Sequence, residues 1–139
     1  MDNYQLVTKG FTILREMLAP FVAAELSIKF KDNWWKAGVL NVLRDDQSRD
    51  LPSEGDWAVL VDSLDIARCL ILIDVLWNEV FKKKLSLDHR NWVKELITTR
   101  NKWAHKGGGD FSSEDAWRAL DTMARLLEHI DNESTEEIR

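Results

Sequence analysis

One short segment of the chain combines residue types that can bind and cleave a phosphodiester. It is the run Arg100-Asn101-Lys102-Trp103-Ala104-His105. An arginine carries a permanent positive charge and a fork of donors that matches a phosphate group. A histidine exchanges protons near neutral pH, which suits general acid–base catalysis. The segment is therefore the first candidate for a functional site.

The pattern around this segment predicts a helix from Ser86 or Leu87 to about His105. Its apolar residues fall on one arc when placed at about 100° per residue. Arg100 lies in the middle of that arc, where a guanidinium is costly unless something pairs with it. Asn101 and His105 fall together at the edge of the arc. Arg100 and His105 are about 140° apart, so one helix does not bring them together.

Helical periodicity recurs along the chain, and no strand pattern does. The first expected helix, Asn3 to Phe30, contains Pro20, which should kink or split it. The last begins after Ser112 as N-cap and should bury five residues of α-helical spacing: Leu120, Met123, Ala124, Leu127 and Ile130. Between them we expect helices over 34–43, 57–81 and 86–105, and a loop over 44–55. These elements predict an all-α, up-and-down bundle of about five helices.

Composition and charge place further limits. The chain has 139 residues, 45% hydrophobic and 31% charged, and a formal net charge of −5. Residues 82–106 nevertheless hold eight basic and two acidic side chains, a plausible footprint for a phosphate backbone. Most of the seven tryptophans and the single cysteine, Cys69, should be buried in the core. No signal peptide or membrane-spanning stretch is visible, which favours the cytoplasm and no membrane partner.

The domain is expected to span residues 1–131. Residues 132–139 are acidic and hold one apolar side chain, Ile138. We expect them to begin a linker to a larger protein, so that downstream domains of the same polypeptide would be partners.

An arginine, a polar residue, three further residues and a histidine at the end of a helix resemble the signature of HEPN domains (higher eukaryotes and prokaryotes nucleotide-binding). The stretch Trp92 to Leu127 is similar to one HEPN branch. Its matching features are Trp92-Val93-Lys94-Glu95-Leu96, Thr99-Arg100-Asn101, Phe111-Ser112 and 117–123. That branch includes a nuclear RNA-surveillance endoribonuclease and N-terminal domains of bacterial ATPases and helicases linked to phage defence.

The resemblance implies a metal-independent ribonuclease without a cofactor. His105 would act in acid–base catalysis, Arg100 would hold the scissile phosphate, and Asn101 would orient His105 or the phosphate. The lysines that would contact RNA are Lys94, Lys102 and Lys106, and Asp74 is a possible supporting carboxylate. Family members pair two copies in a two-fold homodimer that joins both motifs in one cleft, and RNA would be the substrate.

Other interpretations remain open at this stage. The domain could be a noncatalytic dimerisation or RNA-binding regulatory module at the front of a defence-related ATPase or helicase. It could also be a toxin-like domain neutralised by an antitoxin partner. Arg100 could pair with Asp74 in the core, and Trp103 is expected to pack rather than stack on bases. His89 and His129 are expected at the surface.

Overall fold

A computed structural model describes the backbone of residues 1–105 and 110–138, and the side chains of these residues up to Ile130. The described part is helical and contains no strand, which confirms the all-α prediction. The α-helices are α1 (Asn3–Phe30), α2 (Asp45–Ser48), α3 (Trp57–Asp62), α4 (Ile66–Val75), α5 (Leu87–Ala104) and α6 (Ser113–Ile138). Short 3₁₀ turns (Lys31–Asn33 and Phe81–Lys83) and a π-helical turn (Lys36–Leu40) connect some of them.

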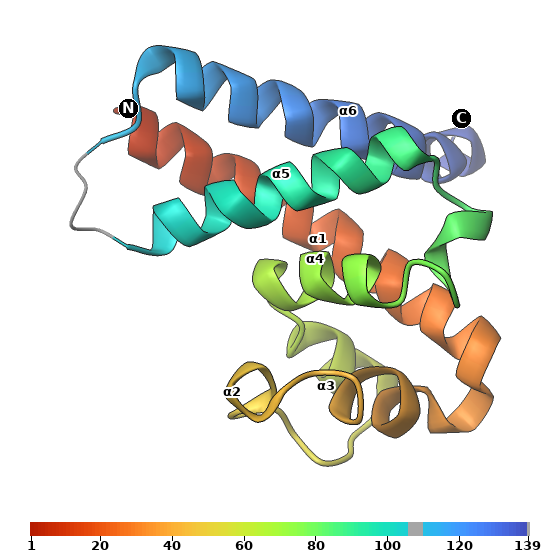
Figure 1. Cartoon of the computed structure of the whole chain (residues 1–139). Helices are drawn as coiled ribbons and strands as arrows, with labels where there is room; N and C mark the ends of the chain where they lie inside the picture. Colours follow the sequence, from red (N-terminus) through yellow and green to blue (C-terminus); the bar gives the residue numbers. More distant parts are fainter. Residues whose placement is uncertain (106–109, 139) are drawn as a thin grey trace.

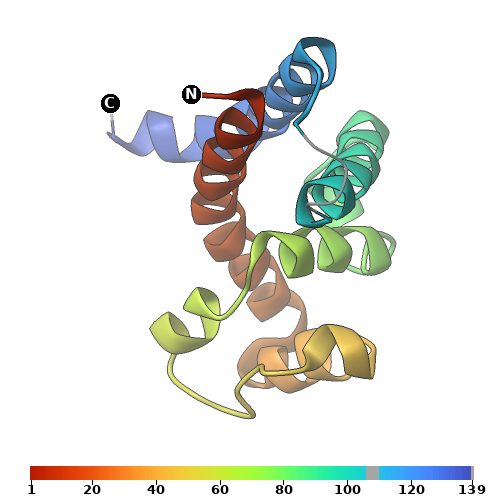
Figure 2. The same ribbon diagram turned by 90° about the vertical axis from the view of Figure 1, so that its left-hand side faces the viewer.

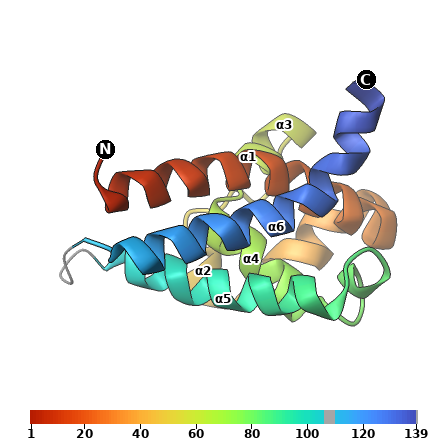
Figure 3. The same ribbon diagram turned by 90° about the horizontal axis from the view of Figure 1, so that it is seen from above.

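Four helices make the body of the molecule. Figure 1 shows α6 above α1 and α5, with α4 below them. Both α4 and α6 contact α1 and α5, so each closes one side of the bundle. Seen from above in Figure 3, α1, α6 and α5 lie side by side along much of their length. The end view in Figure 2 places the short helices α2 and α3 below this body.

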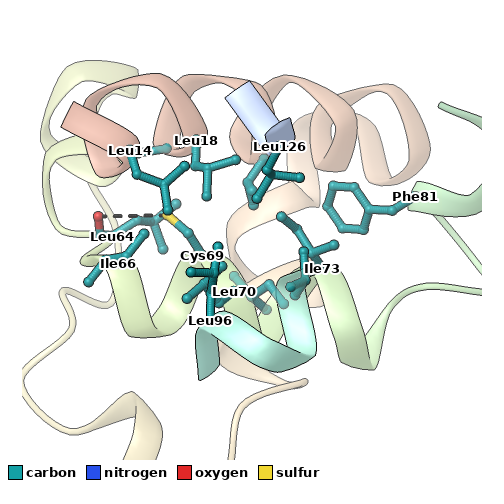
Figure 4. Packing of buried hydrophobic residues seen from close by; sticks show 14 of the residues in the cluster. Leu14, Leu18, Leu64, Ile66, Cys69, Leu70, Ile73, Phe81, Leu96 and Leu126 are labelled. Carbon is teal, nitrogen blue, oxygen red and sulfur yellow. Dashed lines mark hydrogen bonds between the residues drawn. The ribbon is translucent and has the colours of Figure 1, made fainter. Parts of the chain in front are cut away.

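The core lies where these four helices meet (Figure 4). Leu14 and Leu18 of α1, Leu96 of α5 and Leu126 of α6 are all completely buried. Cys69 of α4 lies among them, and burial raises the pKa of its thiol to about 12. It therefore behaves as a small buried hydrophobe, as the sequence predicted.

Most of the tryptophans lie in the core or against it, as the sequence predicted. Trp34, Trp35 and Trp77 are buried, and Trp92 and Trp103 are partly buried against the core. The other two, Trp57 and Trp117, are 46% and 70% exposed.

The structure contradicts the splitting of α1 at Pro20 and part of the buried stripe expected on α6, of which Met123 and Ile130 are buried as predicted. Pro20 does not split α1, which continues from Asn3 to Phe30. Pro20 lies on the solvent-facing side, where water can bond to the carbonyl that the proline leaves without a partner. On α6, Leu126 is buried and Ala124 is exposed, so the buried stripe is rotated relative to the expected one.

The expected long helix over 57–81 is also broken, into α3, α4 and the turns after Val75. Asp65 caps α4 by accepting a hydrogen bond from Arg68 N. Arg15 of α1 contacts the backbone between α3 and α4. Its Nε donates to the Leu64 carbonyl at 2.9 Å, and its Nη2 donates to the carbonyls of Val61 and Asp62. Val61 and Asp62 are the last two residues of α3 and Leu64 follows it, so Arg15 bonds to carbonyls at and just beyond the end of this helix.

Arg15→Leu should therefore lower the free energy of unfolding by about 2 kcal/mol, because charge-assisted bonds to three half-buried carbonyls are lost. Urea denaturation monitored by circular dichroism measures this. Lys9→Leu, at an exposed position of the same helix, is the control and should change stability by less than about 0.5 kcal/mol. Equal effects of the two substitutions would contradict the role given to Arg15.

Candidate nucleic-acid site

Arg100 occupies a position of α5 that faces the bundle. It follows Val93 by seven residues and Leu96 by four, and both of these are completely buried. Arg100 itself is half-buried. Its Nε atom is buried and has no hydrogen-bond partner among the described residues. A buried charged donor without an acceptor lowers the stability of the folded state by about 1–3 kcal/mol or more. A hydrogen-bond acceptor that reached Arg100 Nε would remove this penalty.

Asn101 and His105 lie on the exposed side of the same helix end. His105 is the C-cap of α5, and its backbone N–H donates to the carbonyls of Asn101 and Lys102, each at 3.3 Å. In the described part of the chain, no side-chain hydrogen bond joins Arg100, Asn101 and His105. The structure therefore brings Asn101 and His105 to one face and leaves Arg100 turned inward, as the helical spacing predicted.

The end of α5 is held by the N-terminus of α1, which the sequence analysis did not foresee. Figure 1 shows the two at the same end of the molecule. The Tyr4 hydroxyl donates to the Trp103 carbonyl at 3.2 Å, and Trp103 Nε1 donates to Thr8 Oγ1 at 2.7 Å. The rings of Tyr4 and Trp103 stack at 6.1 Å between centroids. Trp103 is thus a packing residue, in line with the expectation.

Asp110 anchors the chain on the other side of the glycine run. Its carboxylate accepts hydrogen bonds from the backbone N–H groups of Asn3, Tyr4 and Phe111. Asn3 in turn donates through its side chain to the Phe111 carbonyl at 2.9 Å. In the sequence, His105 therefore lies between two residues that contact the start of α1, Trp103 and Asp110. A lone aspartate after three glycines is the only sequence signal for this anchor, and it is weak.

The predicted RNA-binding lysines already have intramolecular partners. Lys102 Nζ lies 3.2 Å from Asp115 Oδ2 and 5.2 Å from the centroid of the Phe111 ring. Lys94 Nζ lies 3.8 Å from Asp74 Oδ1. More than half of each lysine side chain remains exposed, so these pairs are weak and solvent-screened. Lys106 lies outside the described residues.

Asp74 does not pair with Arg100. Its carboxylate lies 3.2 Å from Arg90 Nε, and Arg90 also packs over the Trp77 ring. Both contacts are made near the start of α5, whereas Arg100 is near its end. The core pairing considered from the sequence is therefore not formed. Asp74 supports the opposite end of the helix.

His89 is not a surface residue, contrary to the expectation, although His129 is exposed. His89 is 9% exposed, and its Nδ1 accepts a hydrogen bond from Ser86 N at 2.9 Å at the start of α5. Its ring contacts Trp92 edge-on and lies 4.5 Å from the His129 ring. Burial lowers the pKa of His89, His129 lowers it further, and Asp88 opposes the shift.

Comparison with known proteins adds one finding. A family model described as Swt1-like HEPN matches residues 9–131. The chain belongs to the Swt1-like HEPN family. The match begins within α1, ends within α6 and includes the segment 100–105. Neither the curated proteins nor the solved structures that were compared gave a match.

Two further observations concern this HEPN chain. Within residues 1–105 and 110–130, no three His, Cys, Asp or Glu side chains gather as a metal site would require. In the described residues, every helix is too short or too polar to cross a bilayer.

Arg100→Met should stabilise the isolated HEPN domain by about 1 kcal/mol, because it replaces an unpaired, partly buried cation with an apolar chain of similar length. Urea denaturation of both proteins measures the difference. Arg90→Met is the matched control and should destabilise the domain, since it breaks the contact with Asp74. Destabilisation by Arg100→Met would show that the guanidinium already has a partner.

The His89 environment predicts a loss of stability in mild acid. Its folded pKa lies below its unfolded value of 6.5, so below pH 6.5 the unfolded chain binds a proton that the folded one resists. The melting temperature should fall as the pH drops through this range. His89→Gln can keep the bond from Ser86 N but does not titrate, and it should flatten the dependence. An unchanged pH profile in this variant would contradict the assignment.

Proposed function

We propose that this HEPN domain is a metal-independent endoribonuclease whose site is formed by Arg100, Asn101 and His105 from two copies of the chain. The observation that carries the proposal is the unsatisfied guanidinium of Arg100, whose buried Nε lacks a partner among the described residues. An arginine kept on a core-facing position without a carboxylate is costly for folding. A phosphate oxygen would satisfy it with a charge-assisted hydrogen bond.

The helical spacing supports the need for two copies. Arg100 and His105 stand about 140° apart on an ideal helix, so a single α5 presents them in different directions. A two-fold pair places the ends of two such helices opposite one another, so that Arg100 of one copy and His105 of the other can face the same cleft. The exposed positions of Asn101 and His105 leave them free for such a cleft.

The proposed chemistry follows from these side chains. One His105 removes the proton of the ribose 2′-hydroxyl, and the 2′ oxygen forms a bond to phosphorus. The bond between phosphorus and the 5′ oxygen breaks, and the second His105 protonates that oxygen. Arg100 offsets the negative charge that develops on the phosphoryl oxygens. The products are a 2′,3′-cyclic phosphate and a 5′-hydroxyl, and DNA is not cleaved because it lacks the 2′-hydroxyl.

Lys94 and Lys102 would contribute nonspecific attraction for the RNA backbone. Each would have to exchange an exposed carboxylate partner for phosphate, and exposed ion pairs are weak enough for that exchange. Lys106 follows the motif directly and belongs to the same basic segment.

The chain should cleave single-stranded RNA in the presence of EDTA, and Arg100→Ala and His105→Ala should each lower the rate at least 100-fold. His129→Ala is the matched control, because His129 is an exposed histidine far along α6 from the motif. Gel electrophoresis of an end-labelled RNA measures cleavage, and the 2′,3′-cyclic product identifies the chemistry. Specific activity should also rise with protein concentration if two copies form the site.

The second candidate is a noncatalytic RNA-binding or dimerisation module. The separation of Arg100 from His105 within one copy favours it, because no contact among the described residues brings these two side chains together. In that case RNA would bind in an Arg100-dependent manner and remain intact, and replacing His105 would leave affinity unchanged.

A further inference from the structure

A groove runs along α1 on the side that faces α3 and α4. At one end, a cavity of about 340 Å³ lies between Phe11, Ile66 and Trp103. At the other, a cavity of about 270 Å³ lies between Pro20, Trp57 and Val61. The two cavities share wall residues on α1 and at the end of α3, namely Arg15, Glu16 and Asp62, so they are neighbours along α1 and are together called the groove. Each end thus has an indole ring in its wall.

The groove is apolar along its floor and acidic along its rim. The carboxylates that line it are Glu16, Asp62 and Asp65, and the basic residue among its lining residues is Arg15. Asp65 is already engaged, because it caps α4 and lies 3.7 Å from Arg68 Nη1. Arg15 is engaged by three backbone carbonyls, and its contact with Asp62 at 3.7 Å leaves that carboxylate 87% exposed. Glu16 is exposed and makes no ion pair with any described side chain. The negative rim is therefore available to a ligand.

These features exclude RNA and acidic peptides as the best occupants, because phosphates and carboxylates would face Glu16 and Asp62 at short range. They match a chain that carries both positive and apolar side chains. Indole rings attract guanidinium and ammonium groups over their faces, and the carboxylates pair with the same groups. Trp57, in the wall of one cavity, is 46% exposed, which leaves apolar area to cover.

We propose that this groove binds a basic, amphipathic polypeptide segment from a partner protein. Its arginine or lysine side chains pair with Glu16 and Asp62, and its apolar side chains cover the floor between Trp57 and Trp103. Apart from Trp103, the residues that line the groove lie outside the segment 82–106, where basic residues gather. Trp103 nevertheless lies on the same turn of α5 as the motif, so a bound segment touches the element that carries Arg100.

Isothermal titration calorimetry of the full chain tests the proposal. The probe is a short peptide in which arginine and leucine alternate, and the comparison peptide carries glutamate in place of each arginine. The arginine peptide should bind and the glutamate peptide should not. The double variant Glu16→Gln/Asp62→Asn should weaken binding about fivefold, the effect of losing two exposed ion pairs.

The matched control is Glu79→Gln/Glu128→Gln, which removes the same charge at exposed positions outside the groove. It should leave the affinity unchanged, and circular dichroism should show all variants folded. Equal weakening by both double variants would mean nonspecific attraction and overturn the proposal. Competition by single-stranded RNA that depends on Glu16 and Asp62 would overturn it in favour of RNA. A change of sedimentation coefficient in the groove variant would assign the groove to a second copy instead.

The test is independent of the ribonuclease proposal. The arginine peptide should bind the Arg100→Ala/His105→Ala protein as tightly as the unaltered chain, because neither residue lines the groove. Loss of RNA cleavage with retained peptide binding would therefore count against the catalytic site alone.

Discussion

Arg100 stands on the face of α5 that packs into the bundle, and its Nε has no acceptor among the described residues. Nearly all buried polar groups in proteins are hydrogen-bonded, so such an exception calls for a reason. Folding alone offers none, because an apolar side chain at this position would pack without the penalty. Binding of a phosphate oxygen would offer one. The proposed function of this domain depends on the Arg100 Nε donor that lacks an acceptor.

The surrounding structure keeps the arginine and the histidine where an anion can use them. Tyr4 and Asp110 hold the chain on both sides of His105, and both contacts involve the first turn of α1. The start of α5 is fixed separately by His89 and by the pairing of Asp74 with Arg90. The helix that carries the motif is therefore held at both ends by residues distant in sequence. Rigid support of this kind is what a preorganised phosphate site requires.

Local signals in the sequence were sufficient for part of this structure. The capping of α6 by Ser112 and the extent of α5 followed from residues within a few positions of each helix end. The break between α3 and α4 was missed although Asp65 is a local N-cap, and the contact of Arg15 with the Leu64 carbonyl could not be foreseen because the two residues are almost fifty positions apart. The burial of His89 was missed for the same reason, since its neighbour His129 belongs to another helix. Helix spacing did predict the inward position of Arg100, because that follows from periodicity alone.

The partner of Arg100 could not be read from the sequence, and Asp74 was a reasonable but incorrect candidate. Only the three-dimensional arrangement pairs Asp74 with Arg90 and leaves Arg100 free of it. The most direct test observes the arginine itself. In nuclear magnetic resonance spectra of the full chain, the Nε–H resonance of Arg100, assigned with Arg100→Lys, should shift and become protected from solvent exchange when a 2′-O-methyl RNA is added. An Nε–H resonance that neither shifts nor gains protection at saturating RNA would contradict the account.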